Sequence, residues 1–338
     1  MNYGLNMKKQ LALFAFAAAL LVACEKEQTA TENTSPKRPE LQEPAKPVRN
    51  AMSVQDSMTE AQKKIQFSTI IFPKGKKDSV MAEFNKNYSE EERYKILAIN
   101  RLDSKNKWRA DTLVIPSTLD ANFMSFAPFP LEVDSLDQVE KLAMFSYSIH
   151  AYALYEKGKL IKWGPSSMGK KATPTKKGLM FTNWKKETAI STSNSEWILR
   201  WNFNTHNTLG IGWHQYELPG FHASHSCMRL LEADAKYMYD WADQWVLTDG
   251  GNTVKAKGTP VIVFGETDFK EKPWLKLAGN AAANTYRLED INNVVKEFIP
   301  EILKEQKNSD SIRAEQAKLI TREDPKNLSG GRKQTGSA

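Results

Sequence analysis

The sequence predicts a β-rich protein of the α+β class, and three observations support this fold class. Apolar and polar residues alternate from Phe145 to Ala153 and again from Trp197 to Phe203, the period-two pattern of strands. The short apolar run Thr259–Gly265 is typical of a buried strand. Between His214 and that run, only Leu231–Trp245 has apolar residues at three- and four-residue intervals, which predicts a single helix.

The composition excludes some classes of function. The chain has 338 residues, of which 41% are hydrophobic and 26% are charged, as expected for one large or two medium globular domains. The formal net charge is +7, and removing residues 1–24, which carry Lys8 and Lys9 but no acidic residue, leaves +5. The positive charges form no stripe or arm, so no nucleic-acid partner is expected. A mild positive charge suits an anionic polymer or surface.

The first 24 residues predict a lipoprotein signal peptide. Lys8 and Lys9 precede the unbroken apolar run 11–23, which has the layout of a secretory signal and is too short to span a bilayer. The run ends in Leu21-Val22-Ala23-Cys24, which resembles a bacterial lipobox, so we expect cleavage before Cys24 and lipidation of it. The alternative is an ordinary signal peptide with a chance Cys. Because Glu25 rather than Asp follows, we expect an outer-membrane lipoprotein facing the periplasm of a Gram-negative bacterium.

Residues 25–60 predict a disordered tether between the lipid and the folded domain. They are rich in Glu, Lys, Thr, Gln and Pro, and such a segment cannot bury enough apolar surface to fold. A few tens of residues let the domain reach well away from the bilayer.

A small α/β region is expected at residues 61–135. A β-type run spans Ile65–Phe72, and Ser89 with Glu92 forms a capping box at the start of a helix. A strand follows at Asp111–Pro116. This helix–strand order resembles the second half of a LysM module, which implies glycan binding for residues 61–118; a packing subdomain without a ligand is the alternative. Residues Ser125–Pro130 predict a linker or a loop pressed onto the next domain.

The β-rich domain is expected at residues 136–268, and a helical extension with a disordered tail at 269–338. A turn at Lys157-Gly158 leads to a second strand at Leu160–Trp163, which predicts a hairpin. Apolar residues from Leu288 to Leu303 predict an amphipathic helix that is kinked or split near Pro300 and packs on the domain. The tail is expected at 327–338.

The segment His214–Arg229 carries the candidate chemistry. It holds three of the five histidines and one of the two cysteines. The leader accounts for Cys24, so Cys227 has no partner for a disulfide within the mature chain. A thiolate is a nucleophile, and a neighbouring imidazole can take its proton, so a His-activated cysteine is predicted. A helix is predicted just after Cys227, and its dipole is expected to favour the thiolate.

Zinc binding is a different interpretation of the same residues. His214, His222, His225 and Cys227 supply nitrogen and sulfur ligands that suit Zn²⁺. Structural zinc sites in short loops favour Cys pairs, however, and the sequence has no HExxH helix. No metal and no other cofactor is therefore expected.

Three separated motifs resemble the YkuD-type L,D-transpeptidase catalytic domain. Ser224–Leu230 is similar to the family's Ser-His-Gly-Cys-Ile/Val-Arg-Leu motif. His214, followed by Leu218-Pro219-Gly220-Phe221, is similar to a short-loop variant of the family's upstream histidine motif. Gly169, Thr173-Pro174-Thr175 and Gly178 resemble its early Gly…Thr-Pro-Thr-Gly segment, and Gly258–Val261 resembles its closing run. The resemblance implies a β-sandwich or barrel with a helix after the catalytic Cys.

The resemblance also implies roles and a reaction. Cys227 is the nucleophile and His214 the general base and acid. Ser224, His225 and Ser226 support the site, with backbone N–H groups of Ser226 and Cys227 as the oxyanion hole. The thiolate attacks the third residue of a peptidoglycan tetrapeptide stem and expels D-Ala. The acyl group then passes to an amine acceptor during cell-wall biogenesis, in which cell shape is set; inhibition by carbapenems is also implied.

Several alternatives stay open for individual residues. Arg229 either binds a substrate carboxylate or forms an ion pair that holds the loop. His206 and His222 are reserve bases, and His150 is expected to be structural on a strand face. Ser226 replaces the family's Gly, which either a positive φ or a close approach of the backbone can require. A degenerate, non-catalytic peptidoglycan-binding protein and a hydrolytic L,D-carboxypeptidase are therefore alternatives. Oligomeric state is not predicted.

Overall fold

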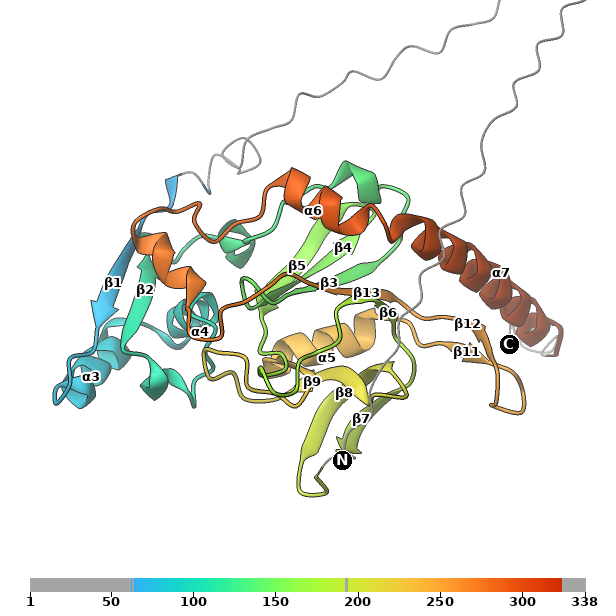
Figure 1. Cartoon of the computed structure of the whole chain (residues 1–338), viewed down its shortest axis with the longest axis horizontal. Coiled ribbons are helices and arrows are strands. Elements are labelled where there is room, and N and C mark those ends of the chain that lie inside the picture. Colours follow the sequence, from blue (N-terminus) through green and yellow to red (C-terminus); the bar gives the residue numbers. More distant parts are fainter. Residues whose placement is uncertain (1–61, 63, 192–193, 324–338) are drawn as a thin grey trace, which may run out of the picture. The chain divides into compact units, whose positions relative to one another are not determined.

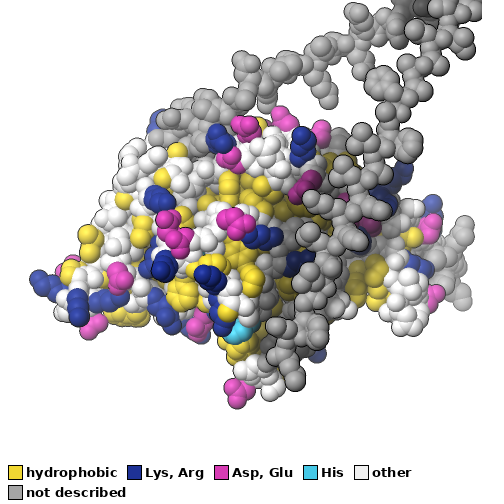
Figure 2. Space-filling model, viewed as in Figure 1, with side chains coloured by type: hydrophobic (Ala, Val, Ile, Leu, Met, Phe, Trp, Pro, Cys, Tyr) yellow, Lys and Arg dark blue, Asp and Glu magenta, His cyan; other side chains and the backbone are white. Residues whose placement is uncertain are grey.

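The computed structural model describes residues 62, 64–191 and 194–323, and Figure 1 shows how their elements are arranged. The predicted leader with Cys24, the tether and the tail from residue 327 lie outside the described residues. None of the helices in the described ranges is long and apolar enough to cross a membrane. On the face drawn in Figure 2, Lys and Arg side chains alternate with Asp and Glu, so that face shows no basic stripe.

The described chain begins with a strand–helix–helix–strand unit. Its elements are β1 (Phe67–Ile71), α3 (Lys77–Asn87), α4 (Glu90–Ile99) and β2 (Thr112–Pro116), and β1 pairs antiparallel with β2. The two helices bury Met81, Phe84, Ile96 and Leu97 in a core of their own. The glycan binding implied by the LysM resemblance stays a prediction.

Of the two helices in this unit, α4 has clear signals in the sequence and α3 has none. The predicted capping box is present at α4: the Ser89 side chain accepts from the N–H of Glu92, and the Glu92 side chain accepts from the N–H of Ser89. No side chain caps α3, which buries only Met81 and Phe84. It therefore has neither a cap signal nor a wide apolar stripe, and this helix was not predicted.

Two larger sheets form the β-rich domain. The five-stranded sheet has the order β5-β4-β3-β13-β6, and its strands are β3 (Leu142–Ser146), β4 (Ala151–Glu156), β5 (Lys159–Pro165), β6 (Gly178–Phe181) and β13 (Pro260–Phe264). The four-stranded sheet has the order β10-β9-β8-β7, and its strands are β7 (Lys185–Ile190), β8 (Ile198–His206), β9 (Ile211–Gln215) and β10 (Met228–Leu230). A small ribbon pairs β11 (Val246–Leu247) with β12 (Val254–Ala256).

The prediction of one strand from Phe145 to Ala153 is wrong. The chain reverses between β3 and β4, which pair antiparallel with Ser146 opposite Ala151. His150, expected on a strand face, lies in this turn with φ of 50°. The alternation of apolar and polar residues continues through the turn, because the turn residues Tyr147 and Ile149 are themselves buried, so the sequence pattern did not indicate the reversal. The β4–β5 hairpin with its turn at Lys157-Gly158 was predicted correctly.

The five-stranded sheet is covered on both faces, as a sandwich requires. One face, with Phe145 and Val261, packs against the four-stranded sheet through Trp213 and against α5 (Glu232–Trp241) through Met238. The predicted helix is therefore present, although it ends earlier than the apolar pattern does.

The opposite face of that sheet is covered by the loop 123–139 and by the C-terminal helices α6 (Leu288–Val295) and α7 (Ile299–Glu323). Ile291, Val295 and Ile302 are buried there, so the split amphipathic segment packs on the domain as predicted. Pro300 is the second residue of α7, where its missing N–H is not needed by the helix. Figure 1 shows α7 extending away from the sheets.

The N-terminal unit is joined to the loop before the nucleophile motif. Leu102 forms an isolated β-bridge with Pro219. The N–H of Asp103 donates to the carbonyl of Leu218 at 3.1 Å, and the N–H of Leu218 donates to Oδ2 of Asp103 at 2.6 Å. Arg101 is buried, and its Nε donates to the carbonyl of Ile149 at 2.8 Å. The N-terminal unit thus positions the loop that leads to Cys227.

Candidate active site

Two parallel neighbouring strands bring the predicted nucleophile and base together. β9 and β10 pair in register with Met228 opposite Trp213 and Arg229 opposite His214. Cys227 therefore stands at the start of β10, beside the strand that carries His214. Cys227 and His214 line one cleft, together with His225, Ser224 and Arg229, with amide side chains from β8 and with tryptophans that directly precede β7 and β8.

His214 is oriented by its own backbone neighbour. Its Nδ1 lies 2.9 Å from the carbonyl oxygen of Gln215. A carbonyl can only accept, so Nδ1 carries the hydrogen and Nε2 is left with a free lone pair. Burial lowers the pKa of His214 to about 4, with the backbone hydrogen bond to Gln215 acting in the opposite direction. His214 is therefore a neutral imidazole, ready to accept a proton, at any pH well above 4.

Cys227 is a free, half-buried thiol. Burial raises its pKa above the ordinary value, while the N–H of Gly212 and the positive charge of Arg229 act to lower it. The expected help from a helix dipole is wrong, because β10 and Leu231 separate Cys227 from the start of α5. The resting pair is accordingly a neutral thiol beside a neutral imidazole, and the proton moves only when the sulfur attacks.

Ser226 occupies the backbone conformation that the family's Gly would favour. Its φ is 87°, in the left-handed region where residues with a Cβ are strained. Its Oγ donates to the carbonyl of Thr173 at 3.4 Å. The suspicion that this position needs a positive φ is confirmed, and the loop adopts this conformation with Ser in place of Gly. Among the described residues, no hydrogen bond uses the backbone N–H of Ser226 or of Cys227, so both remain available to an oxyanion.

Ser224 holds the nucleophile loop. Its Oγ donates to the carbonyl of Cys227, and its N–H donates to the carbonyl of Met168 at 3.0 Å. Its own carbonyl accepts from the N–H of Lys170 at 3.0 Å and from Oγ1 of Thr173. The hydroxyl of Ser224 is thus committed to the loop, and its contribution to the site is to fix the position of Cys227.

The segment Gly169–Thr175 packs directly on that loop. Gly169 bridges to Ser224, and its N–H donates to Oγ1 of Thr175 at 3.0 Å. A Cβ on Gly169 would lie 2.2 Å from the carbonyl oxygen of Thr173, so only Gly fits this close approach. The motif similarity in this segment therefore has a structural cause.

Three of the other histidines are not placed as bases. His222 is buried: its Nδ1 accepts from the N–H of Met168 at 2.9 Å, and its Nε2 lies 3.0 Å from the carbonyl of Tyr147. Its ring stacks on that of His150 with centroids 3.7 Å apart. His206 lies outside the cleft, with Nε2 3.1 Å from Nζ of Lys176. His222 therefore anchors the loop rather than moving protons.

His225 lies at the rim of the cleft and is exposed. Its Nε2 is 3.0 Å from Nζ of Lys170, and its ring centroid is 5.0 Å from that of Trp197. Partial burial lowers its pKa, and the positive charges of Lys170 and Arg229 lower it further. The position suits contact with a substrate, in keeping with the supporting role implied by the motif.

Arg229 holds the loop through backbone carbonyls rather than through an ion pair. Its guanidinium donates to the carbonyls of Glu217 at 3.5 Å and Ala223 at 3.3 Å, and lies 4.4 Å from the ring centroid of Tyr216. Within the described ranges no carboxylate oxygen lies within 4.0 Å of the Arg229 guanidinium. Burial lowers the pKa of Arg229, and the charge of Glu217 acts in the opposite direction. A guanidinium has five N–H donors, so some remain for a carboxylate in the cleft. The predicted ion pair is therefore replaced by contacts with backbone carbonyls, and binding of a substrate carboxylate stays a prediction.

Sequence reasoning missed part of the cleft. Gly212, whose N–H faces the thiol, was not predicted as part of the site. In the structure a Cβ at this position would lie 2.3 Å from the carbonyl oxygen of Phe203, so the close approach requires Gly. Trp184 and Trp197, which directly precede β7 and β8, also line the cleft and were not predicted as site residues.

The site offers no preformed metal centre in the part of the chain that the structure describes. No group of three His, Cys, Asp or Glu side chains there could hold a metal ion. The two ring nitrogens of His222, one of the four candidate zinc ligands, both lie within hydrogen-bonding distance of backbone groups.

Residues 141–263 match the family model of the L,D-transpeptidase catalytic domain, YkuD. Solved structures similar to the chain include an L,D-transpeptidase from Stackebrandtia nassauensis, with 24% identity over 37% of this chain and 56% of that one and a TM-score of 0.30. An L,D-transpeptidase from Mycobacterium smegmatis is 20% identical over 38% of this chain and 59% of that one, with a TM-score of 0.30. L,D-transpeptidase 1 from Mycobacterium tuberculosis is 22% identical over 38% of this chain and 63% of that one, with a TM-score of 0.29. The chain thus spans 56–63% of these relatives. None of the curated proteins matches it.

Proposed function

We propose that the YkuD-type L,D-transpeptidase catalytic domain formed by residues 141–263 is an active cysteine acyltransferase on peptidoglycan stem peptides. One observation carries the proposal: Cys227 and His214 line a single cleft from adjacent parallel strands, and Gln215 fixes the imidazole tautomer that can accept the thiol proton. A nucleophile, a base and a group that orients the base are the three elements that acyl transfer through cysteine requires.

In the first half-reaction the sulfur of Cys227 attacks the carbonyl of the third residue of a tetrapeptide stem. The thiol proton passes to Nε2 of His214, and the carbonyl oxygen becomes an oxyanion that the free N–H groups of Ser226 and Cys227 stabilise. The C–N bond then breaks. D-Ala leaves with the proton returned by His214, and a thioester on Cys227 remains.

In the second half-reaction an amine of another stem attacks the thioester. Its proton passes to His214, the C–S bond breaks, and the sulfur of Cys227 takes the proton back. Attack by water instead of an amine would give L,D-carboxypeptidase activity. The amine acceptor is proposed because it is the reaction implied by the family motif.

The neutral state of the catalytic pair shapes the energetics of the first step. The pKa of His214 is about 4 and the pKa of Cys227 is raised, so proton transfer before attack is uphill. The positive guanidinium of Arg229 favours negative charge on the sulfur. Proton transfer coupled to attack avoids a free thiolate in the buried cleft.

A degenerate, non-catalytic site is the second candidate, and the replacement of the motif Gly by Ser226 is the observation that favours it. The geometry weighs against it, because Ser226 has a positive φ and the thiol, the base and the loop hydrogen bonds are all retained. Incubation of the wild type and Cys227→Ala with purified tetrapeptide muropeptides, followed by mass spectrometry, separates the two. Release of D-Ala by the wild type alone supports the enzyme; no product from either protein supports the degenerate site.

We further propose that the protein is anchored by lipid on Cys24 in the outer membrane and faces the periplasm. The lipobox-like sequence Leu21–Cys24 and Glu25 motivate this. Cells expressing the wild type or Cys24→Ala, fed with an alkyne-labelled fatty acid and fractionated, test it. Label and outer-membrane location are expected for the wild type alone.

A further inference from the structure

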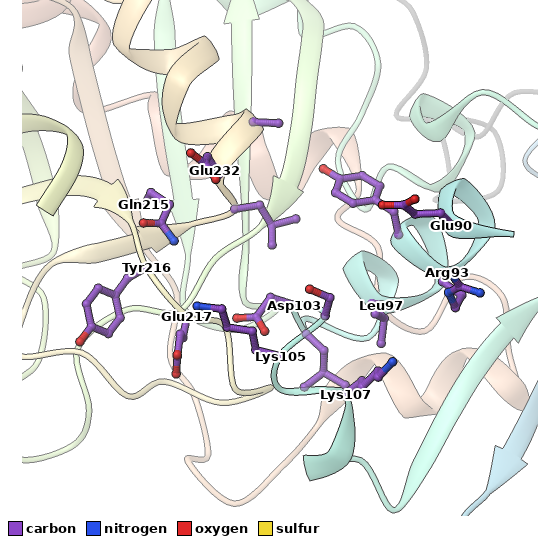
Figure 3. A pocket seen from close by; sticks show the side chains of 15 residues that line it. Glu90, Arg93, Leu97, Asp103, Lys105, Lys107, Gln215, Tyr216, Glu217 and Glu232 are labelled. Carbon is purple, nitrogen blue, oxygen red and sulfur yellow. The ribbon is translucent and has the colours of Figure 1, made fainter. Parts of the chain in front are cut away.

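A second cavity adjoins the catalytic cleft. It has a volume of about 470 Å³ and lies between the N-terminal unit and the catalytic domain. Figure 3 shows Gln215, Tyr216 and Glu217 on one side of it, Glu90 of α4 on the other, and Lys105 between them. Tyr216 lines both this cavity and the cleft that contains Cys227. We call the second cavity the interdomain groove.

The groove carries charged groups that the fold does not use. Among the described residues, Lys105, Glu217 and Glu90 make no side-chain ion pair or hydrogen bond, although the negative charge of Glu217 interacts with the guanidinium of Arg229 and acts against the lowering of its pKa by burial. By contrast, Asp103 accepts from the N–H of Leu218 and is committed to the fold. Unpaired charges of both signs in a concave site suit a ligand that itself carries both signs.

The groove meets the cleft on the side of the general base. The rings of His214 and Tyr216 are 5.9 Å apart, and Gln215, whose carbonyl orients His214, also lines the groove. In the second half-reaction the incoming amine must give its proton to His214. The acceptor therefore has to reach the thioester beside His214, and Tyr216 is the residue that lines both the groove and the cleft that contains the thioester.

We propose that the interdomain groove binds the acceptor stem peptide, a short peptide with carboxylates and a side-chain ammonium. This rests on the proposed transpeptidase function. Lys105 pairs with a carboxylate of the acceptor, and Glu217, next to Tyr216, attracts the ammonium toward the cleft. The ammonium first gives one proton to solvent and becomes a free amine. The amine then attacks the thioester: it loses a second proton to His214 as its C–N bond forms and the C–S bond to Cys227 breaks, and the sulfur takes that second proton.

An uncharged glycan strand is the less fitting occupant. Sugar hydroxyls have no need for the unpaired charges of Lys105 and Glu217, whereas a zwitterionic peptide satisfies both. The groove also adjoins the cleft in which, under the proposed function, the thioester on Cys227 reacts with a peptide amine.

The test separates the two half-reactions in the full chain. Lys105→Ala and Glu217→Gln are compared with the wild type and with Lys86→Ala, which removes an exposed lysine of α3 outside the groove. Donor tetrapeptide alone gives the rate of D-Ala release and the mass of the acyl-enzyme. Acceptor stem peptide is then added at varied concentration to give the acceptor KM of transfer.

Both groove variants should form the acyl-enzyme at a rate within about twofold of the wild-type rate. Their acceptor KM should rise about three- to tenfold, because a partly exposed charge pair stabilises a complex by about this factor in affinity. Lys86→Ala should match the wild type in both steps. An unchanged acceptor KM, or equal loss in both half-reactions, overturns the acceptor assignment. Weaker retention of the variants on intact sacculi with an unchanged acceptor KM assigns the groove to the glycan strand instead. No acyl-enzyme from the wild type refutes the proposed function itself.

Discussion

The hydroxyl of Ser226 reaches the backbone carbonyl of Thr173 at 3.4 Å from a backbone with φ of 87°. The residue before the nucleophile is thus held in a strained conformation by the segment that carries the Thr-Pro-Thr motif. The two motifs are separated in sequence, yet they form one structural unit around Cys227. A contact between Ser226 and Thr173 therefore links the two motifs in this structure.

Relief of this strain should be measurable. Ser226→Gly should raise the free energy of unfolding by up to about 1 kcal/mol, because strain at φ of 87° outweighs the added freedom of Gly in the unfolded chain. Acylation of Cys227 should persist. Ser226→Val, a β-branched residue at positive φ, should lower that free energy by roughly 1–3 kcal/mol. Urea denaturation checks both, and a Val variant as stable as the wild type would contradict the backbone assignment.

Activity should persist to unusually low pH. The pKa of His214 is about 4, so the imidazole is neutral and able to accept a proton above that pH, and this ability is lost as the pH falls through about 4. The acid limb of kcat/KM for D-Ala release should therefore lie near pH 4. A limb near 6.5, the ordinary pKa of His, would show that His214 is solvated or is not the base.

Stability should depend on pH in the same range for a different reason. Burial lowers the pKa of His214 and of His222 to about 4 and that of His150 well below its ordinary value. The unfolded chain therefore binds more protons than the folded chain between about 6.5 and 4, so stability is full above 6.5 and falls as the pH drops. Each of these histidines contributes at most about 1.4 kcal/mol per pH unit.

Urea titrations between pH 7 and 4.5 measure this slope. The variant His222→Gln removes one of the buried imidazoles, so its free energy of unfolding should fall less steeply with decreasing pH, whatever its stability at pH 7. Equal slopes for the variant and the wild type would mean that His222 is not buried as a neutral ring.

Arg229 should lower the pKa of the Cys227 thiol in addition to holding the loop. Arg229→Met removes the guanidinium near the thiol, so the pKa of Cys227 should rise further. Alkylation of Cys227 at pH 8 should slow by roughly tenfold, the effect of one pKa unit. Arg229→Lys keeps the charge but loses the two-pronged contact with the carbonyls of Glu217 and Ala223, and should fall in between. Alkylation rates against pH, followed by mass spectrometry, distinguish the three proteins.

The joint between the N-terminal unit and the catalytic loop should be energetically important. Asp103→Ala leaves the N–H of Leu218 without its acceptor, so the free energy of unfolding should fall by about 1–3 kcal/mol. Hydrogen exchange of the Leu218 amide should speed up in the variant. Unchanged exchange would show that Asp103 does not hold this loop.

Much of the fold was predictable where local signals and burial agree. The capping box at Ser89, the hairpin turn at Lys157-Gly158 and the buried strand at Thr259–Gly265 all correspond to elements of the structure. The reversal between β3 and β4 was not predictable, because the buried turn residues continue the alternation of the strands. The helix α3 carries no cap and only a narrow apolar face.

The sequence could predict that the candidate residues from Ser224 to Arg229 lie close together, because they belong to one continuous motif. The family resemblance of the domain is confirmed by the match at residues 141–263. Tertiary structure was needed for the rest: the stacking of His222 on His150, the approach of Gly212 to the thiol and the loop contacts of Arg229 all join distant segments. The predicted effect of a helix dipole on Cys227 is wrong, because the three residues of β10 and Leu231 lie between Cys227 and α5.

The central claim is that Cys227, with His214 as its base, becomes acylated by a tetrapeptide stem. Intact-protein mass spectrometry after brief mixing with donor tetrapeptide tests it most directly. The wild type should gain the mass of the donor without D-Ala, His214→Ala should gain it much more slowly, and Cys227→Ala should gain none. No adduct on the wild type, or the same adduct on Cys227→Ala, would contradict the account.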